Sequence, residues 1–148
     1  RIKMQIMIIG RGENNNKFKK FINQNRLNKI VKIFYTPNPF TFIRRADIFI
    51  LTSKFEGLPN VLLESISLKK FVISSDCPTG PKEILDNGKG GLLFKTGDEN
   101  DLTKKIVYYN SNKSLCKKKI IHSYKRLERF NCDNNLKKYL VLVKKYLN

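Results

Sequence analysis

Short aliphatic segments alternate with helical segments along most of this chain, and this alternation is the feature that most limits its fold. Residues 4–9, 47–51 and 71–75 are rich in consecutive apolar residues, and each is followed by a loop that contains glycine or proline. Such runs are typical of parallel strands buried on both faces, and the helical spacing between them predicts crossover connections. We therefore expect an α/β fold with a parallel sheet and helices on both faces.

Strands and helices are expected in turn up to residue 109. The expected strands are residues 4–9, 29–35, 47–51, 71–75 and 91–94, and the expected helices are residues 17–27, 40–45, 60–68, 82–85 and 101–109. From residue 113 onward the pattern is helical only, with a break near residues 131–134. Since 148 residues suit a single core, we expect a domain over residues 1–112 and a helical segment over residues 113–148 that packs on it.

Ligands of parallel sheets bind beyond the carboxyl ends of the strands. Four loops lie there and are predicted to converge on one cleft: residues 10–12, 35–36, 52–59 and 75–80. Gly10, Arg11 and Gly12 lack the full dinucleotide fingerprint. We interpret them, together with Tyr35, as the lining of a nucleotide pocket in which Arg11 faces a diphosphate; a purely structural turn is the alternative.

The formal charge of +18 comes from 30 basic and 12 acidic residues. Three explanations are open: a coding bias toward Lys, Asn and Ile, attraction to an anionic membrane surface, and nucleic-acid binding. Lysine is spread along the chain, which favours bias, and no helix-turn-helix, zinc-finger or aromatic RNA-binding pattern is present. No apolar run is long enough to span a bilayer and no signal-peptide pattern opens the chain. We expect a cytoplasmic protein, with peripheral contact to the inner face of the cell membrane as an addition.

Residues 55–64 carry the most informative chemistry, because they follow an expected strand and open an expected helix. Gly57 lets the backbone approach a ligand, and the free N–H groups of a helix start favour an anion such as a diphosphate. Glu64, about one turn into the helix, is placed to accept both hydroxyls of a ribose. Glu56, before the turn, is placed to accept hydroxyls of a donor sugar. The alternative is that both are solvated surface charges.

This segment resembles the Glu-x7-Glu signature of retaining glycosyltransferases with the GT-B fold, family 4. Segments around it resemble the family's strands and helices: residues 46–53, 60–65, 71–76, 81–85 and 90–94. The resemblance covers about residues 4–110 and implies the Rossmann-like, nucleotide-sugar-binding C-terminal domain of such an enzyme. It implies that Glu64 binds the ribose and that the catalytic Glu56 binds the donor sugar. The backbone groups offered to sugar and phosphate are those of Gly57, Leu58, Pro59 and Asn60.

The resemblance also implies parts that precede residue 1. These are the domain's first strand, with the Arg and Lys that hold the diphosphate, and the N-terminal acceptor domain. Tyr35 stands where relatives often have Gly, which leaves the base contacts of that loop open. We expect a fragment or truncated product that is inactive alone.

The expected function is retaining transfer of a hexosyl group from a UDP-sugar to a glycan or polyprenyl-linked acceptor in surface polysaccharide or glycoconjugate biosynthesis. Residues 77–81 suggest the polyprenyl acceptor, since they resemble a variant found in capsule enzymes. No metal and no cofactor besides the donor substrate are expected, and the single histidine supports no metal site. A non-catalytic nucleotide-binding module is the main alternative, and a GT-B sugar epimerase a third.

For three further residues the sequence gives only weak evidence of a role in the site. Lys54 is equally consistent with a phosphate partner and a solvated lysine. His122 lies in a Lys-rich helical segment and is expected on the surface, whereas Cys77 is expected to be a packing thiol. With no Cys-x-x-Cys spacing, the three cysteines are expected to be free thiols.

Overall fold

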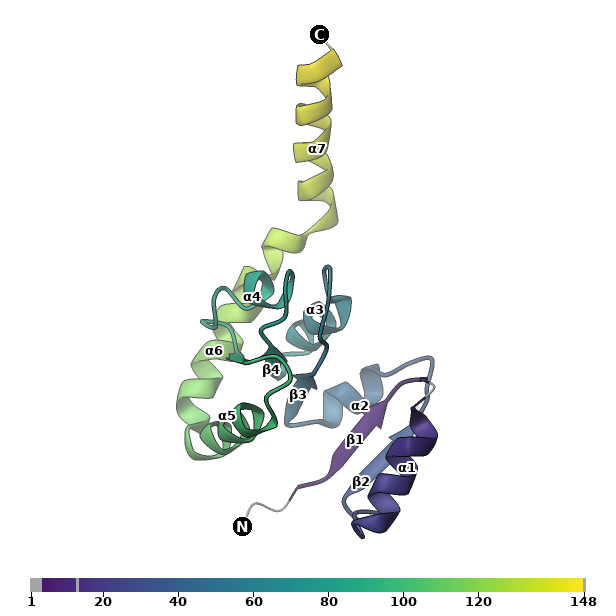
Figure 1. Ribbon diagram of the computed structural model, residues 1–148. Helices are drawn as coiled ribbons and strands as arrows, with labels where there is room; N and C mark the ends of the chain where they lie inside the picture. The colour runs from purple at the N-terminus through teal and green to yellow at the C-terminus, as the bar shows by residue number, and fades with distance from the viewer. Residues whose placement is uncertain (1–3, 13, 148) are drawn as a thin grey trace. The chain divides into compact units, whose positions relative to one another are not determined.

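The computed structural model describes residues 4–12 and 14–147, and the chain forms two compact units, Arg1–Thr41 and Phe42–Asn148 (Figure 1). The first unit contains β1 (Ile6–Ile9), α1 (Asn15–Gln24) and β2 (Val31–Phe34), and α2 (Phe40–Arg45) lies at the boundary. The second unit contains β3 (Ile48–Leu51), α3 (Asn60–Ser67), β4 (Phe71–Ser75), α4 (Pro81–Ile84), β5 (Leu92–Phe94), α5 (Glu99–Ser111), α6 (Lys113–Arg126), the 3-10 helix η1 (Leu127–Phe130) and α7 (Cys132–Leu147). The expected elements are all present, with ends that differ by up to three residues.

The first unit is a strand–helix–strand motif. β1 and β2 pair in parallel, with Ile6 opposite Val31 and Ile9 opposite Phe34. The helix α1 makes the crossover between them and buries Ile22. Ile6, Met7 and Ile8 of β1 are about 40% exposed and Ile9 is half-buried, although all four are apolar.

The second unit contains a parallel sheet in the order β3-β4-β5. All five residues of β4 are buried. A central parallel strand covered on both faces requires this burial, and the run Phe71 to Ile73 supplies apolar side chains to both faces in alternation.

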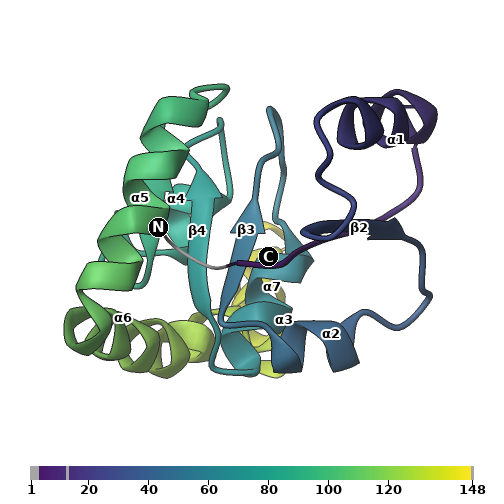
Figure 2. The same ribbon diagram turned by 90° about the horizontal axis from the view of Figure 1, so that it is seen from below.

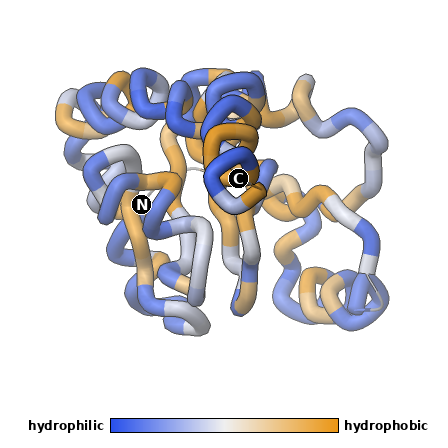
Figure 3. The backbone as a smooth tube through the Cα atoms, turned by 90° about the horizontal axis from the view of Figure 1, so that it is seen from above, coloured by the Kyte–Doolittle hydropathy of each residue, from blue (hydrophilic) through white to orange (hydrophobic). Residues whose placement is uncertain are grey.

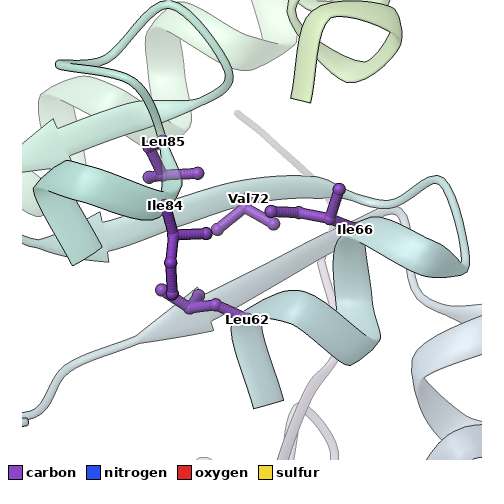
Figure 4. Packing of buried hydrophobic residues seen from close by; sticks show 5 residues of the cluster. All are labelled: Leu62, Ile66, Val72, Ile84 and Leu85. Carbon is purple, nitrogen blue, oxygen red and sulfur yellow. The ribbon is translucent and has the colours of Figure 1, made fainter. Parts of the chain in front are cut away.

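Helices cover both faces of this sheet. On one face Val72 packs with Leu62 and Ile66 of α3 and with Ile84 and Leu85 at α4 (Figure 4). On the other face the buried cluster contains Phe71, Ile73, Phe94 and Cys116, with partly buried side chains of α5 and α6 packed against it. Figure 2 shows α3 and α5 on opposite sides of β3 and β4. The predicted parallel α/β class is confirmed, with the described strands paired as two separate sheets.

The C-terminal helices differ in how they pack. α6 contacts β4, α3 and α5. The chain turns at Asn131, where the expected break lies, and the Asn131 side chain accepts a hydrogen bond from the Asn134 N–H at 3.0 Å, a typical helix-capping contact. α7 has no buried residue among those described, and its colour alternates between hydrophobic and hydrophilic along its length (Figure 3). The predicted domain boundary after residue 112 stays a prediction, since the compact units divide at Thr41.

Candidate functional site

The loop between β3 and α3, residues 52–59, carries the predicted signature and is called the signature loop below. Pro59 is buried and extended at the N-cap position of α3, with φ −70° and ψ 96°, and no side chain caps the helix. The carbonyl of Pro59 accepts the N–H of Leu62 at 2.9 Å. The N–H groups at the start of α3 therefore have no capping side chain and can meet an anionic ligand.

In the chain, Glu56 precedes this helix start and Glu64 lies within α3. Both are half-buried. Within residues 4–12 and 14–147, neither carboxylate has a hydrogen-bond or ion-pair partner. Half-buried acceptors without protein partners are suited to hydroxyl groups of a ligand, because an ionised carboxylate gains most from donors in partly desolvated surroundings.

Glu64 lines a pocket of about 420 Å³ between α3 and the segment that follows α6. The lining residues are Leu63, Glu64 and Ser67 of α3 and Leu127, Glu128, Phe130 and Asn131 of the following segment. Sequence reasoning missed this second group, because only the break near residue 131 was visible in the pattern. The pocket combines carboxylates with apolar side chains, a mixture that fits a polar ring such as a ribose.

The loop after β4 lies against the signature loop, as expected for neighbouring parallel strands. The buried Ser75 hydroxyl donates to the Ser53 carbonyl at 2.6 Å, and the Thr79 hydroxyl donates to the Glu56 carbonyl. Cys77 is buried, as predicted for a packing thiol. Two of the four loops at the strand ends are therefore joined within the second unit.

The other two loops meet within the first unit. The Gly10 N–H donates to the Phe34 carbonyl at 3.1 Å, which continues the ladder of β1 and β2. The Arg11 guanidinium carbon lies 3.7 Å from the centre of the Tyr35 ring, a cation–π contact that presents both exposed side chains together. Convergence of all four loops on one cleft involves both units and stays a prediction.

A second pocket, of about 560 Å³, lies at the carboxyl ends of β4 and β5. Its lining residues are Asp76, Pro78, Leu93, Phe94, Lys95, Thr96 and Asp101. The Lys95 N–H donates to the Asp101 carboxylate at 2.9 Å, and this bond holds the pKa of Asp101 below its ordinary value. The sequence carried no signal for this pocket beyond its place at the sheet edge.

Two further candidates are His122, on α6, and Lys54, within the signature loop. His122 contacts Asp86 with 2.8 Å between Nε2 and Oδ2, and its side chain is 36% exposed, so the residue expected on the surface is half-buried and paired with a carboxylate. Lys54 is exposed. Among the described residues no group of three His, Cys, Asp or Glu side chains is placed to hold a metal ion, and no helix is long and apolar enough to cross a bilayer.

Comparison with known proteins gives one family. The model of the family described as glycosyl transferases group 1 matches residues 1–126. An uncharacterized glycosyltransferase of Methanocaldococcus jannaschii is 43% identical over 82 residues, which are 55% of this chain and 20% of that protein. A poly(ribitol-phosphate) alpha-N-acetylglucosaminyltransferase of Staphylococcus aureus is 26% identical over 91% of this chain and 28% of its own length.

The name of a third relative includes a lipid-linked acceptor. It is an N-acetylgalactosamine-N,N'-diacetylbacillosaminyl-diphospho-undecaprenol 4-alpha-N-acetylgalactosaminyltransferase of Campylobacter jejuni, 27% identical over 67% of this chain and 27% of its own length. The chain thus spans between 20% and 28% of the length of these three relatives.

Solved structures match the fold closely. A Staphylococcus aureus TarM variant in complex with fondaparinux, alpha-GlcNAc-glycerol and UDP has a TM-score of 0.83 and 25% identity, over 93% of this chain and 28% of TarM. A glycosyltransferase from Rickettsia africae has a TM-score of 0.86 and 22% identity, over 99% of this chain and 41% of its own. The second match supports the fold alone.

Proposed function

This chain belongs to the glycosyl transferases group 1 family, and from that premise we propose that it is the donor-binding domain of a retaining hexosyltransferase. The donor is a UDP-sugar, and the acceptor is a glycan or a polyprenyl-linked sugar in surface polysaccharide or glycoconjugate biosynthesis. We propose that this chain holds the donor.

One observation carries the proposal: Glu56 and Glu64 flank an uncapped helix start, and neither carboxylate has a partner among the described residues. Free N–H groups at the start of α3 attract the diphosphate. Glu64 then accepts the ribose hydroxyls, and Glu56 accepts hydroxyls of the donor sugar. Gly57, Leu58, Pro59 and Asn60 offer backbone groups between them.

The names of related proteins support the class of donor and acceptor. The TarM complex contains UDP, and the Staphylococcus and Campylobacter relatives carry a polymeric phosphate and a diphospho-undecaprenol acceptor in their names. We propose the same classes for this protein. Its +18 charge supports peripheral contact with an anionic membrane on the cytoplasmic side, where a lipid-linked acceptor would lie.

In the first unit we propose that Gly10, Arg11 and Tyr35 contact the nucleotide. The Arg11 guanidinium over the Tyr35 ring offers a flat cation that can pair with a phosphate, and the glycine leaves the backbone open to the ligand. The developing charge on the leaving UDP is then stabilised by helix N–H groups and basic side chains.

Two isosteric substitutions test the assignment. Glu64→Gln removes the charge from the ribose acceptor, and a charge-assisted hydrogen bond contributes about 1.5–3 kcal/mol. We expect affinity for UDP to fall by roughly one to two orders of magnitude. Glu56→Gln keeps the affinity for UDP and lowers both the affinity for the intact donor and the transfer rate.

The measurement is calorimetric titration of the protein with UDP and with UDP-glucose, UDP-galactose and their N-acetylated forms. Equal losses of UDP affinity in both variants would refute the division of roles. UDP binding without transfer in the unmodified protein would favour a non-catalytic nucleotide-binding module.

A further inference from the structure

The loop that follows β4 touches the main chain of the signature loop. Ser75 is fully buried, and its hydroxyl donates to the Ser53 carbonyl at 2.6 Å. The Thr79 hydroxyl lies within hydrogen-bond reach of the carbonyls of Glu56 and Pro78. Contacts to carbonyl groups fix the path of the signature loop and leave its side chains free.

The turn at Thr79 and Gly80 is conformationally strained at Thr79. Both residues have positive φ, +61° and +81°, and a β-branched residue such as Thr rarely adopts this conformation. A Cβ added to Gly80 would overlap the Gly57 carbonyl oxygen and lie 2.6 Å from Pro59 Cδ. Only glycine permits this approach, and strain of this kind persists where the surroundings fix it, often at functional sites.

Side-chain packing contributes little to holding the front of the signature loop. Phe55 is 79% exposed and Leu58 is 50% exposed, while the Glu56 carboxylate has no partner among the described residues. Pro59, at the back of the loop, is buried against Gly80. The main-chain contacts from the β4 loop are therefore what orients the segment that bears Glu56.

We propose that Ser75, Thr79 and Gly80 are positioning residues that clamp the signature loop and so place the Glu56 carboxylate toward the donor sugar. This inference rests on the proposed role of Glu56. The clamp acts on the path of the signature loop, so we expect it to affect binding of the intact donor and to leave UDP affinity unchanged.

Thr79→Val tests the clamp, because it keeps the β-branched shape and removes the hydroxyl, and Thr79→Ser is the matched control that keeps the hydroxyl. Thr79→Val loses one hydrogen bond of ordinary strength. We expect this loss to lower the rate at which UDP is released from the UDP-hexose by roughly three- to tenfold. Thr79→Ser retains the unmodified rate. UDP affinity is the same in all three proteins.

A double substitution distinguishes positioning from general weakening. If Thr79 acts through Glu56, adding Thr79→Val to Glu56→Gln causes little further loss. An equal loss from Thr79→Val in both backgrounds would overturn the proposal.

Amide hydrogen exchange measures how firmly the signature loop is held, and it needs no ligand. Exchange at residues 53–58 is expected to speed up in Thr79→Val and in Gly80→Ala. It is expected to stay unchanged in Gly88→Ala, where glycine also has positive φ but nothing lies near an added Cβ. Unchanged exchange in both Thr79→Val and Gly80→Ala would refute the clamp. If no UDP-hexose binds the unmodified protein, the proposed function fails while this measurement still decides the clamp.

Discussion

His122 and Asp86 join α6 to the turn that follows α4. Asp86 and Asn87 both have positive φ, and three side chains of α6 hold this turn: His122 and Arg126 contact the Asp86 carboxylate, and the Lys119 ammonium donates to the Gly88 carbonyl at 2.5 Å. The hydrogen bond from His122 is the main reason that the pKa of Asp86 lies below its ordinary value of 3.8. The pair stabilises a turn far along the chain from the signature loop.

Asp86→Asn is expected to lower the free energy of unfolding near neutral pH. A carboxyl whose folded pKa is depressed contributes stability above its unfolded pKa and loses it as the pH falls through the folded pKa. The difference between the two proteins should therefore shrink below about pH 3.8. Asn tolerates positive φ, so the variant does not strain the turn.

Urea unfolding of both proteins at a series of pH values checks this expectation. Asp47→Asn is the control, since it makes the same chemical change at an exposed carboxylate outside this turn. A difference that persists at low pH would show that the ionised pair is not the cause.

At the scale of elements, α7 differs from the helices around the sheet. Its apolar side chains Leu136, Leu140, Val143 and Leu147 are between 50% and 79% exposed, and they lie on one face at helical spacing. α3, by contrast, buries Leu62 and Ile66 completely or nearly so. The sequence predicted that this face of α7 packs on a body and is partly exposed in this chain, and within the described residues the face is exposed.

This contrast predicts different effects of the same substitution. Leu62→Ala creates a cavity in the core and is expected to cost about 2–5 kcal/mol of unfolding free energy. Leu140→Ala, at 52% exposure, is expected to change it by no more than about 0.5 kcal/mol. Denaturant unfolding of the chain at several protein concentrations is the measurement. A large, concentration-dependent loss in Leu140→Ala would show that α7 is covered by a second copy.

At the scale of the whole molecule, the main feature is the net positive charge of +18. With 30 basic and 12 acidic residues, the surface attracts anions over distances set by the Debye length, about 8 Å at physiological ionic strength. This attraction favours binding of the diphosphate donor and the lipid-linked acceptor that we propose, because both carry negative charge.

The chain is expected to sediment with vesicles of phosphatidylcholine and phosphatidylglycerol at low salt. Release should follow at about 1 M salt, where the Debye length is about 3 Å, and vesicles of phosphatidylcholine alone should bind little. Binding that persists at high salt would instead indicate insertion of apolar side chains. Absence of binding at low salt would contradict the membrane contact.

The sequence by itself determined the elements and the main candidates of the site. The run from Phe71 to Ile73 predicted a buried strand, and Gly57 and Pro59 predicted the start of α3 at Asn60, because such signals depend on near neighbours in the chain. Glu56 and Glu64 were found in the same way, since their spacing places them around one helix start.

Only the tertiary structure decided which distant residues meet. Thr79 and Glu56 are 23 residues apart, His122 and Asp86 are 36 apart, and the pocket beside Glu64 includes Glu128 and Phe130. The tertiary structure alone also decided that the strands pair in two sheets and that α7 is exposed. Hydrophobic periodicity reports which face of an element is apolar, whereas contacts between distant residues depend on strand register and turn geometry, which periodicity does not encode.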